Sequence, residues 1–201
     1  MDLPPNRHRS PLDSDASVPA ARVIAVADLN LAPADEFVAR LAGIFEHSPW
    51  VAQRALGARP FDSRQQLLEA MRAAVDEASP EEQLTLIRAH PKLGLIGRRR
   101  AELTEASSRE QHRAGLDACT PEEAARMETL NAEYLEKFSV PFIVAVRGHN
   151  PASIIANCER RMRNDWPLER RTALREIGLI AEYRLAEAVA AIQDESPENH
   201  G

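Results

Sequence analysis

Apolar residues recur along most of the chain at the three- and four-residue spacing of an amphipathic α-helix. Three stripes carry the pattern most clearly: Phe37, Leu41, Ile44 and Phe45; Leu67, Leu68, Met71 and Val75; and Met127, Leu130, Tyr134 and Phe138. No internal repeat accompanies them. The pattern predicts an all-α fold, a single compact helical domain of about seven to nine helices.

Residues that favour the first turn of a helix precede several helical segments. A capping side chain followed by proline occurs at Ser48-Pro49, Ser79-Pro80, Thr120-Pro121 and Asn150-Pro151. The capping oxygen accepts a bond from a free backbone N–H, and proline suits the first helical position because it has no N–H to satisfy. The spacing also predicts capping boxes from Ser63 to Gln66, Ser79 to Glu82 and Thr120 to Glu123.

One apolar stretch, VPFIVAV at residues 140–146, departs from the helical pattern. It is short and rich in β-branched residues, and no partner strand is evident for it. We therefore expect a buried extended segment that threads between the helices. Its backbone N–H and C=O groups must then bond to other segments, to water or to a ligand.

Composition and charge narrow the class of protein. The 201 residues carry a formal net charge of −6, which argues against a general nucleic-acid-binding protein. No stretch reaches the apolar length of a membrane span. The basic run Arg98-Arg99-Arg100 is expected to be a solvated loop or helix start. Cys119 and Cys158 have no motif spacing, so we expect free thiols in a reducing compartment, the cytoplasm.

The two ends of the chain differ from its middle. The first residues are rich in Pro, Ser and Asp and lack the apolar core of a signal peptide. We expect a disordered segment over residues 1–22, the helical domain over residues 23–193 and a flexible tail over residues 194–201.

The stretch LIRAHPKLG places a histidine where a helical pattern stops. Pro91 disfavours the α conformation of the residue before it, so His90 should close the helix with its ring aimed away from that helix. Imidazole titrates near neutral pH and suits general acid–base catalysis. Most histidines, however, are structural or simply exposed to solvent, so a non-functional interpretation of His90 remains the alternative.

A second candidate is Glu110, which shares one helical face with Leu103, Ala106 and Ala114. A carboxylate on such a face lies either at the rim of the domain or against a cavity, and the rim is the commoner case. Ser107 and Ser108 precede Glu110 and are expected near the helix start. Their hydroxyls and free N–H groups would there suit an anion or a carbonyl oxygen.

The third candidate is Arg184, which follows Ile177 and Ala181 on what reads as a buried seam of the last helix. Either the aliphatic part of the side chain is packed and the guanidinium reaches water, or the guanidinium is positioned to bind a carboxylate. Because methionine would remove the buried charge and keep the packing of the aliphatic part of the side chain, we expect Arg184→Met to fold at least as well as the wild type. Three nearby arginines, Arg160, Arg161 and Arg163, are interpreted as a solvated face.

Metal and cofactor sites are not indicated. His90, Glu110, His112 and His149 are possible metal ligands, but no pair has the spacing of a zinc site. The chain has no Gly-rich phosphate loop, nucleophile elbow or dinucleotide fingerprint. We expect neither a metal nor a cofactor.

Five segments together resemble the 2-oxo-4-hydroxy-4-carboxy-5-ureidoimidazoline (OHCU) decarboxylase family. They are FEHSPWVAQRA, RAHPKLG, LTEASSREQHRAGL, LNAEYLEKFSVPFIVAVRG and EIGLIAEYRL, in the same order as in the family and within residues 29–192. The resemblance implies an all-helical homodimer without a cofactor that converts a small ureide to (S)-allantoin in urate degradation. From the net charge and the lack of a membrane-length apolar stretch, we expect neither nucleic acid nor membrane as a partner.

The resemblance also implies roles for individual residues. Three are implied to be catalytic: His90 as the acid–base, Glu110 and Arg184. Others are implied to bind the substrate: Pro91, Ser107, Ser108, Arg109 and Gln111, and Phe142, Ile143, Val144, Ala145 and Val146 in the extended segment. Two alternatives remain open, a non-catalytic helical interaction module and a hydrolase of a neighbouring ureide such as 5-hydroxyisourate.

Overall fold

Helices dominate the computed structural model, which describes residues 23–93 and 103–190. Within these ranges there are nine α-helices and two short 3-10 turns, at the upper end of the predicted number. The α-helices are α1 (Val26–Leu31), α2 (Ala34–Leu41), α3 (Pro49–Ala55), α4 (Arg64–Asp76), α5 (Pro80–Arg88), α6 (Glu105–Arg113), α7 (Pro121–Phe138), α8 (Pro151–Arg161) and α9 (Trp166–Ala188). The 3-10 turns are η1 (Leu56–Ala58) and η3 (Leu116–Ala118).

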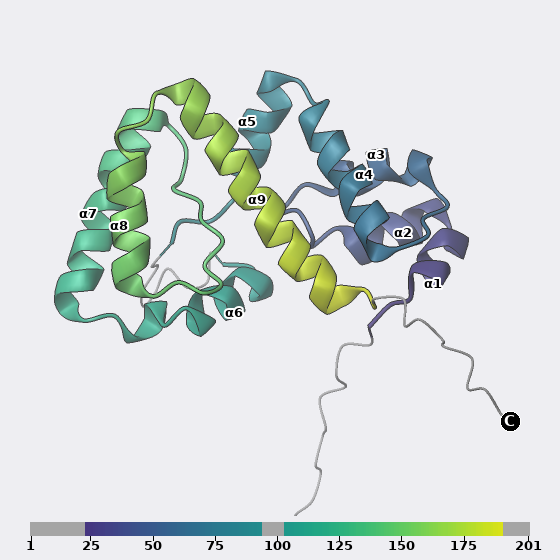
Figure 1. Cartoon of the computed structure of the whole chain (residues 1–201), viewed down its shortest axis with the longest axis horizontal. Helices are drawn as coiled ribbons and strands as arrows, with labels where there is room; N and C mark the ends of the chain where they lie inside the picture. The colour runs from purple at the N-terminus through teal and green to yellow at the C-terminus, as the bar shows by residue number, and fades with distance from the viewer. Residues whose placement is uncertain (1–22, 94–102, 191–201) are drawn as a thin grey trace, which may run out of the picture.

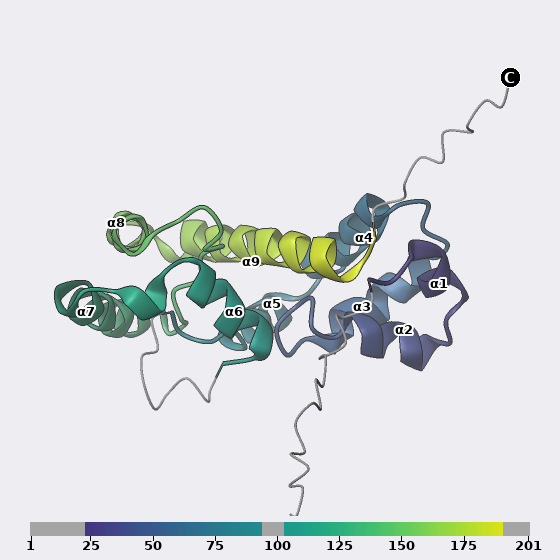
Figure 2. The ribbon, with the colours of Figure 1, turned by 90° about the horizontal axis from the view of Figure 1, so that it is seen from below.

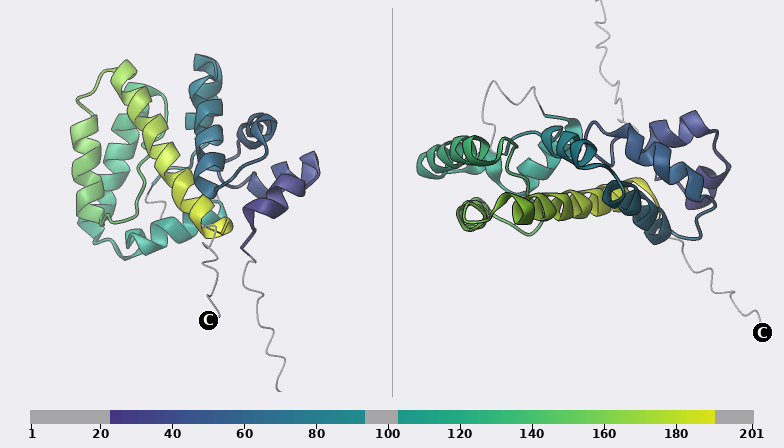
Figure 3. Two further views of the ribbon diagram at one scale, coloured as in Figure 1. Left: turned by 45° about the vertical axis from the view of Figure 1, so that its right-hand side comes forward. Right: turned by 90° about the horizontal axis from the view of Figure 1, so that it is seen from above.

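The last helix, α9, lies at the centre of the fold. It crosses the molecule diagonally, with α7 and α8 on one side and α1 to α4 on the other (Figure 1). Edge-on views show two layers: α8, α9 and α4 form one, while α7, α6, α5 and α3 lie in the other (Figures 2 and 3). The predicted apolar stripes are buried between these elements. A helix in this central position can carry a side chain into the middle of the domain.

Most of the predicted helix starts are confirmed. Ser79 and Thr120 form complete capping boxes with Glu82 and Glu123. The box predicted at Ser63 is only half formed, because the side chain of Gln66 accepts instead from the backbone N–H of Asp62. At the four Ser/Thr/Asn-Pro starts, the helix begins at the proline in every case. The Ser48 side chain, however, makes no capping bond.

The apolar run at residues 140–146 is the predicted buried extended segment. Every residue from 140 to 146 is buried, and the segment runs between α9 and the α7–α8 pair (Figure 1). The carbonyl of Ile143 accepts from Arg161 at 2.6 Å, and the N–H of Ala145 donates to Glu176 at 3.0 Å. Charged side chains of α8 and α9 therefore make hydrogen bonds with backbone groups that a neighbouring strand would bond in a sheet.

Arg161 was predicted to lie on a solvated face, and that prediction is wrong. Its side chain is buried, pairs with Glu169 at 2.5 Å and stacks over the Phe142 ring. Glu169 also accepts from the Tyr134 hydroxyl. The neighbouring Arg160 and Arg163 are exposed, as predicted. A run of arginines at a helix end does not reveal which one turns inward, because the partner lies eight residues further on in the next helix.

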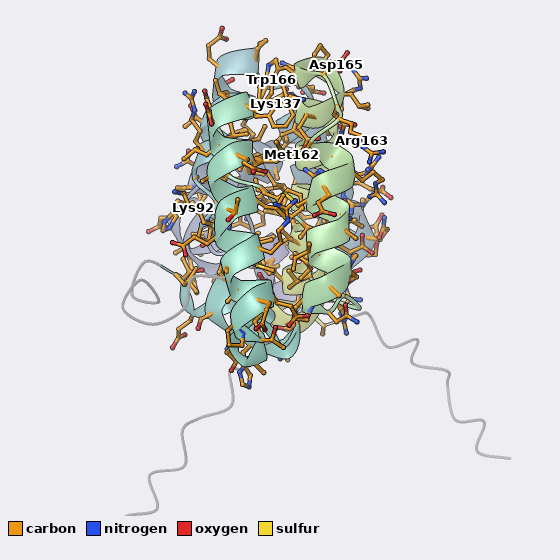
Figure 4. The ribbon with its side chains drawn as sticks, turned by 90° about the vertical axis from the view of Figure 1, so that its left-hand side faces the viewer. Lys92, Lys137, Met162, Arg163, Asp165 and Trp166 are labelled. Atoms are coloured by element: carbon orange, nitrogen blue, oxygen red, sulfur yellow. The ribbon has the colours of Figure 1, made fainter. Side chains whose placement is uncertain are left out.

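Short polar contacts fasten the ends of the elements. Lys137 of α7 donates to the carbonyls of Met162 and Asn164 at 2.6 and 3.0 Å, which ties the turn after α8 to α7 (Figure 4). The Ile24 N–H donates to the carbonyl of Ala188, the last residue of α9, and the Ile24 carbonyl accepts from the N–H of Ala190, both at 2.9 Å. Both cysteines are free, as predicted.

Several predictions concern residues that the structure does not describe. The disordered segment 1–22, the basic run 98–100 and the tail 194–201 lie outside the described ranges. Within those ranges, no helix combines the length and apolar character needed to traverse a bilayer.

Candidate active site

His90, Glu110 and Arg184 meet at one small cavity although they come from three distant parts of the chain. The cavity measures about 30 Å³, and its walls come from the end of α5, from α6, from the extended segment and from α9. The lining residues are His90, Pro91, Leu93, Ser107, Glu110, Gln111, Phe142, Ile143, Val144, Val146, Ile180 and Arg184. The walls thus combine an apolar strip with a few convergent polar groups, as in sites for small molecules.

His90 ends α5 as expected, but its ring does not point away from that helix. The ring folds back, and Nδ1 lies 3.0 Å from the carbonyl oxygen of Leu86 in the last turn. A carbonyl only accepts hydrogen bonds, so Nδ1 carries the proton. The Nε2 atom is buried and has no hydrogen-bond partner among the described residues. The imidazole is therefore held in one tautomer with a free lone pair.

The electrostatic environment keeps the His90 ring neutral. Burial lowers the pKa of His90 to about 4, against the opposing effects of the Leu86 hydrogen bond and the Glu46 carboxylate. At neutral pH the ring is uncharged, and Nε2 can accept a proton or a hydrogen bond. An unpartnered lone pair in a buried position is costly unless a ligand or water fills it.

Arg184 is neither solvated nor unpaired. Its Nε and one Nη donate to the two carboxylate oxygens of Glu110 at 2.7 and 3.0 Å, a bidentate pair. The remaining N–H groups donate to the Glu46 carboxylate at 2.5 Å, the Ser107 hydroxyl at 3.0 Å and the Gly43 carbonyl at 3.3 Å. All five donors of the guanidinium are in use, so its plane and position are fixed.

Glu46 is the functional-site residue that the sequence reasoning missed. Its side chain is fully buried between α2 and α3, where it accepts from Arg184, Thr104 and Ser107. Burial acts to raise the pKa of Glu46, but the Arg184 charge and the bonds from Thr104 and Arg184 outweigh it and hold the pKa below its usual value. The available signal was a single carboxylate beside the apolar stripe that ends at Phe45.

Helix α6 presents only part of the predicted SSREQ segment to the cavity. The helix begins after Thr104, which caps the N–H of Ser107, so the expected start at Ser107 and Ser108 is wrong. Ser107, Glu110 and Gln111 share the cavity-facing side. Ser108 and Arg109 do not line the cavity. They are one and two positions after Ser107, and residues so spaced on an α-helix point to different sides.

The extended segment contributes four of its five predicted residues. Phe142, Ile143, Val144 and Val146 line the cavity, whereas Ala145 does not. The Ala145 N–H is already bonded to Glu176 on α9. Pro91 lines the cavity beside His90.

The polar groups around the cavity do not form a metal-binding set. Across residues 23–93 and 103–190, no three His, Cys, Asp or Glu side chains gather as ligands would. Of the four possible ligands considered from the sequence, His112 instead pairs with Asp117 at 2.6 Å and His149 contacts Ser153 at 3.0 Å. The two carboxylates at the site face a guanidinium.

Comparison with known proteins gives consistent matches over most of the chain. Residues 30–186 match the family model described as OHCU decarboxylase. A Haloferax volcanii protein named 2-oxo-4-hydroxy-4-carboxy-5-ureidoimidazoline decarboxylase is 48% identical over 153 residues, covering 76% of this chain and 89% of the relative. A Mus musculus protein of the same name is 33% identical over 156 residues, covering 78% and 88%.

Solved structures show the same arrangement of helices. A crystal structure of (S)-allantoin synthase aligns with a TM-score of 0.66 at 28% identity, covering 83% of this chain and 54% of that chain. A crystal structure of OHCU decarboxylase in the presence of (S)-allantoin aligns with a TM-score of 0.61, covering 74% of this chain and 96% of that chain. At 21% identity, this second match supports the fold alone.

Proposed function

The chain belongs to the OHCU decarboxylase family, and we propose that it removes CO₂ from 2-oxo-4-hydroxy-4-carboxy-5-ureidoimidazoline to form (S)-allantoin. The observation that carries the proposal is the neutral, unpartnered His90 at a cavity whose other polar groups are an oriented carboxylate and its guanidinium. This set suits proton transfer on a small polar substrate.

The substrate itself can accept the electrons released by decarboxylation. Its carboxylate is on a carbon adjacent to a ring C=N bond, so the electron pair of the breaking C–C bond moves between the two carbons and the C=N electrons move to nitrogen. Nitrogen then takes up a proton. Loss of the hydroxyl proton and protonation of the ureido-bearing carbon complete allantoin. No electron-accepting cofactor is required for this sequence, unlike decarboxylations that depend on one.

His90 is proposed to act on the substrate hydroxyl proton. The Nε2 lone pair is free, and the Leu86 bond prevents the ring from turning the protonated nitrogen inward. General acid–base assistance of this kind contributes about two to four orders of magnitude in rate. A low pKa keeps the ring available as a base throughout the neutral range.

Glu110 and Arg184 are proposed to orient the substrate as one unit. Glu110 is 26% exposed, lines the cavity and is held by a bidentate pair to Arg184. Its carboxylate is thus placed to accept bonds from substrate N–H or O–H groups. Ser107 and the backbone of the extended segment complete the proposed binding surface, together with Pro91 and Gln111. Fixed groups of this kind favour one orientation of the ring and hence one product enantiomer.

Formation of optically active product tests the proposed function. The unstable substrate is generated in situ from urate with urate oxidase and 5-hydroxyisourate hydrolase, and allantoin is followed by circular dichroism. We expect this protein to accelerate the appearance of the (S)-allantoin signal. Formation of racemic allantoin at the spontaneous rate would refute the proposal. Omitting the hydrolase tests the alternative, because a 5-hydroxyisourate hydrolase would then replace it.

Assembly is proposed on the family resemblance, and location on the two free cysteines, which suit a reducing compartment. We propose a homodimer in the cytoplasm, with residues 23–193 as the catalytic unit. Light scattering of the purified chain measures the first point, and a fluorescent fusion in the native host measures the second.

A further inference from the structure

The cavity beside His90 is too small to receive the substrate from solution by itself. Its volume of about 30 Å³ has room for about two water molecules. A second hollow of about 370 Å³ adjoins it, and the two share Glu110 and Val146 as lining residues. We call this hollow the vestibule; its other lining residues are Arg113, Ala114, Arg147, Gly148, Tyr183 and Glu187. A ligand that approaches past Glu110 passes through the vestibule.

The two arginines of the vestibule differ in how their charge is compensated. Arg113 pairs with Glu187 at 2.5 Å. The Arg147 guanidinium instead lies over the Tyr183 ring, 4.9 Å from its centroid, and makes no ion pair with any carboxylate that the structure describes. Stacking on an aromatic face orients a guanidinium without neutralising it. Arg147 is therefore the uncompensated cation of the vestibule.

Arg184 has no donor left for another carboxylate. Its five N–H groups are bonded to Glu46, Glu110, Ser107 and Gly43. Two carboxylates already share this one guanidinium, so a third would face net negative charge there. An anionic ligand must find its counter-charge elsewhere along the route.

Resting on the proposed function, we propose that Arg147 binds the substrate carboxylate in the vestibule and so selects the anionic substrate over the neutral product. Arg147 directly follows Val146, the last cavity-lining residue of the extended segment, and Tyr183 precedes Arg184 on α9. The stacked pair is thus attached to two walls of the cavity. After CO₂ leaves, the product has no carboxylate, and Arg147 no longer favours its retention.

Substitutions that separate charge from shape test this role. Arg147→Gln removes the charge and keeps much of the side-chain length, whereas Arg147→Lys keeps the charge. Arg126→Gln on α7 removes a cation from an exposed pair with Glu159, away from the vestibule, and controls for the change in net charge. The assay is steady-state (S)-allantoin formation, with added (S)-allantoin as product inhibitor, at low and at high ionic strength.

We expect Arg147→Gln to raise KM about twofold to fivefold at low ionic strength, the effect of one solvent-exposed charge pair. The change in kcat should be smaller, and the difference in KM should shrink at high salt because screening weakens exposed pairs. The inhibition constant of neutral (S)-allantoin should not move. Arg147→Lys should recover part of the loss, and Arg126→Gln should match the wild type.

Two outcomes would overturn the role of Arg147 while leaving the decarboxylase activity in place. One is an unchanged KM and salt dependence in Arg147→Gln. The other is a parallel rise of KM and of the inhibition constant of (S)-allantoin, which would mean that Arg147 shapes the vestibule and does not recognise the negative charge of the substrate. A wild-type protein without activity would instead refute the proposed function itself.

Discussion

Replacing Arg184 with methionine should cost far more stability than the sequence suggests. The sequence shows no buried partner, and an unpaired buried charge is itself costly, so its removal alone would not be expected to destabilise the fold. The structure reverses that expectation because Arg184→Met would leave Glu46 ionised, fully buried and without its cation. The hydroxyls of Thr104 and Ser107 still donate to Glu46, but neither carries charge.

The magnitude follows from the burial of the pair. Removing one partner of a buried ion pair costs about 3–5 kcal/mol. For a domain of this size each kcal/mol lowers Tm by about 2–4 °C, so the expected loss is about 6–20 °C. Arg126→Met is the matched control: its pair with Glu159 has an N–O distance of 2.7 Å, but the two side chains are 43% and 44% exposed, against 7% and 0% for Arg184 and Glu46. That control should cost less than about 1 kcal/mol.

A double-mutant cycle measured by urea unfolding completes the test. Glu46→Gln in the Arg184→Met background removes the unpaired negative charge of the Glu46 carboxylate and keeps a hydrogen-bond acceptor for Thr104. With Glu46→Gln measured alone as the second single variant, we expect a coupling energy of about 0.5–3 kcal/mol, the range found for contacting residues, with the double variant more stable than the sum of the two single losses predicts. An Arg184→Met variant as stable as Arg126→Met, or a double variant with strictly additive losses, would refute the account of Glu46 as a buried counter-ion.

Two further predictions concern protons and metals. In the unfolded chain the pKa of His90 is about 6.5, whereas burial lowers its pKa in the folded protein to about 4. The free energy of unfolding should therefore fall by about 3 kcal/mol as the pH drops from above 6.5 to 4, because only the unfolded chain takes up the proton in this range. His90→Asn should lack this part of the slope in urea titrations, and identical slopes would contradict the assignment. Chelators should leave activity intact, since no metal-ligand grouping occurs in the described ranges. Loss of activity in EDTA that zinc or manganese restores would contradict this.

The helices and the extended segment could be predicted from the sequence because their signals are local. A capping box needs two residues three positions apart, as at Ser79 and Glu82, and an amphipathic stripe is contained within one helix. The extended run at residues 140–146 broke the helical period and lies buried, as its apolar character required. Such features depend little on where the rest of the chain goes.

Charges that pair across the fold could not be predicted in this way. Glu46 and Arg184 are 138 residues apart, and only the packing of α9 against the turn after α2 makes them partners. Arg161 resembled its exposed neighbours because Glu169 belongs to the next helix. The His90 ring turned back to Leu86 because a neighbouring helix-end carbonyl was available, which the effect of Pro91 on the backbone does not reveal.

The most direct measurement is (S)-allantoin formation by His90→Asn in the circular dichroism assay, beside His112→Asn as a control. His112 is exposed on α6 and pairs with Asp117, outside the cavity. Asparagine keeps a polar group at residue 90 but cannot exchange a proton near neutral pH. The account predicts that a folded His90→Asn loses about two to four orders of magnitude in rate, while His112→Asn remains near wild type. A folded His90→Asn that forms (S)-allantoin at a near-normal rate would contradict the account.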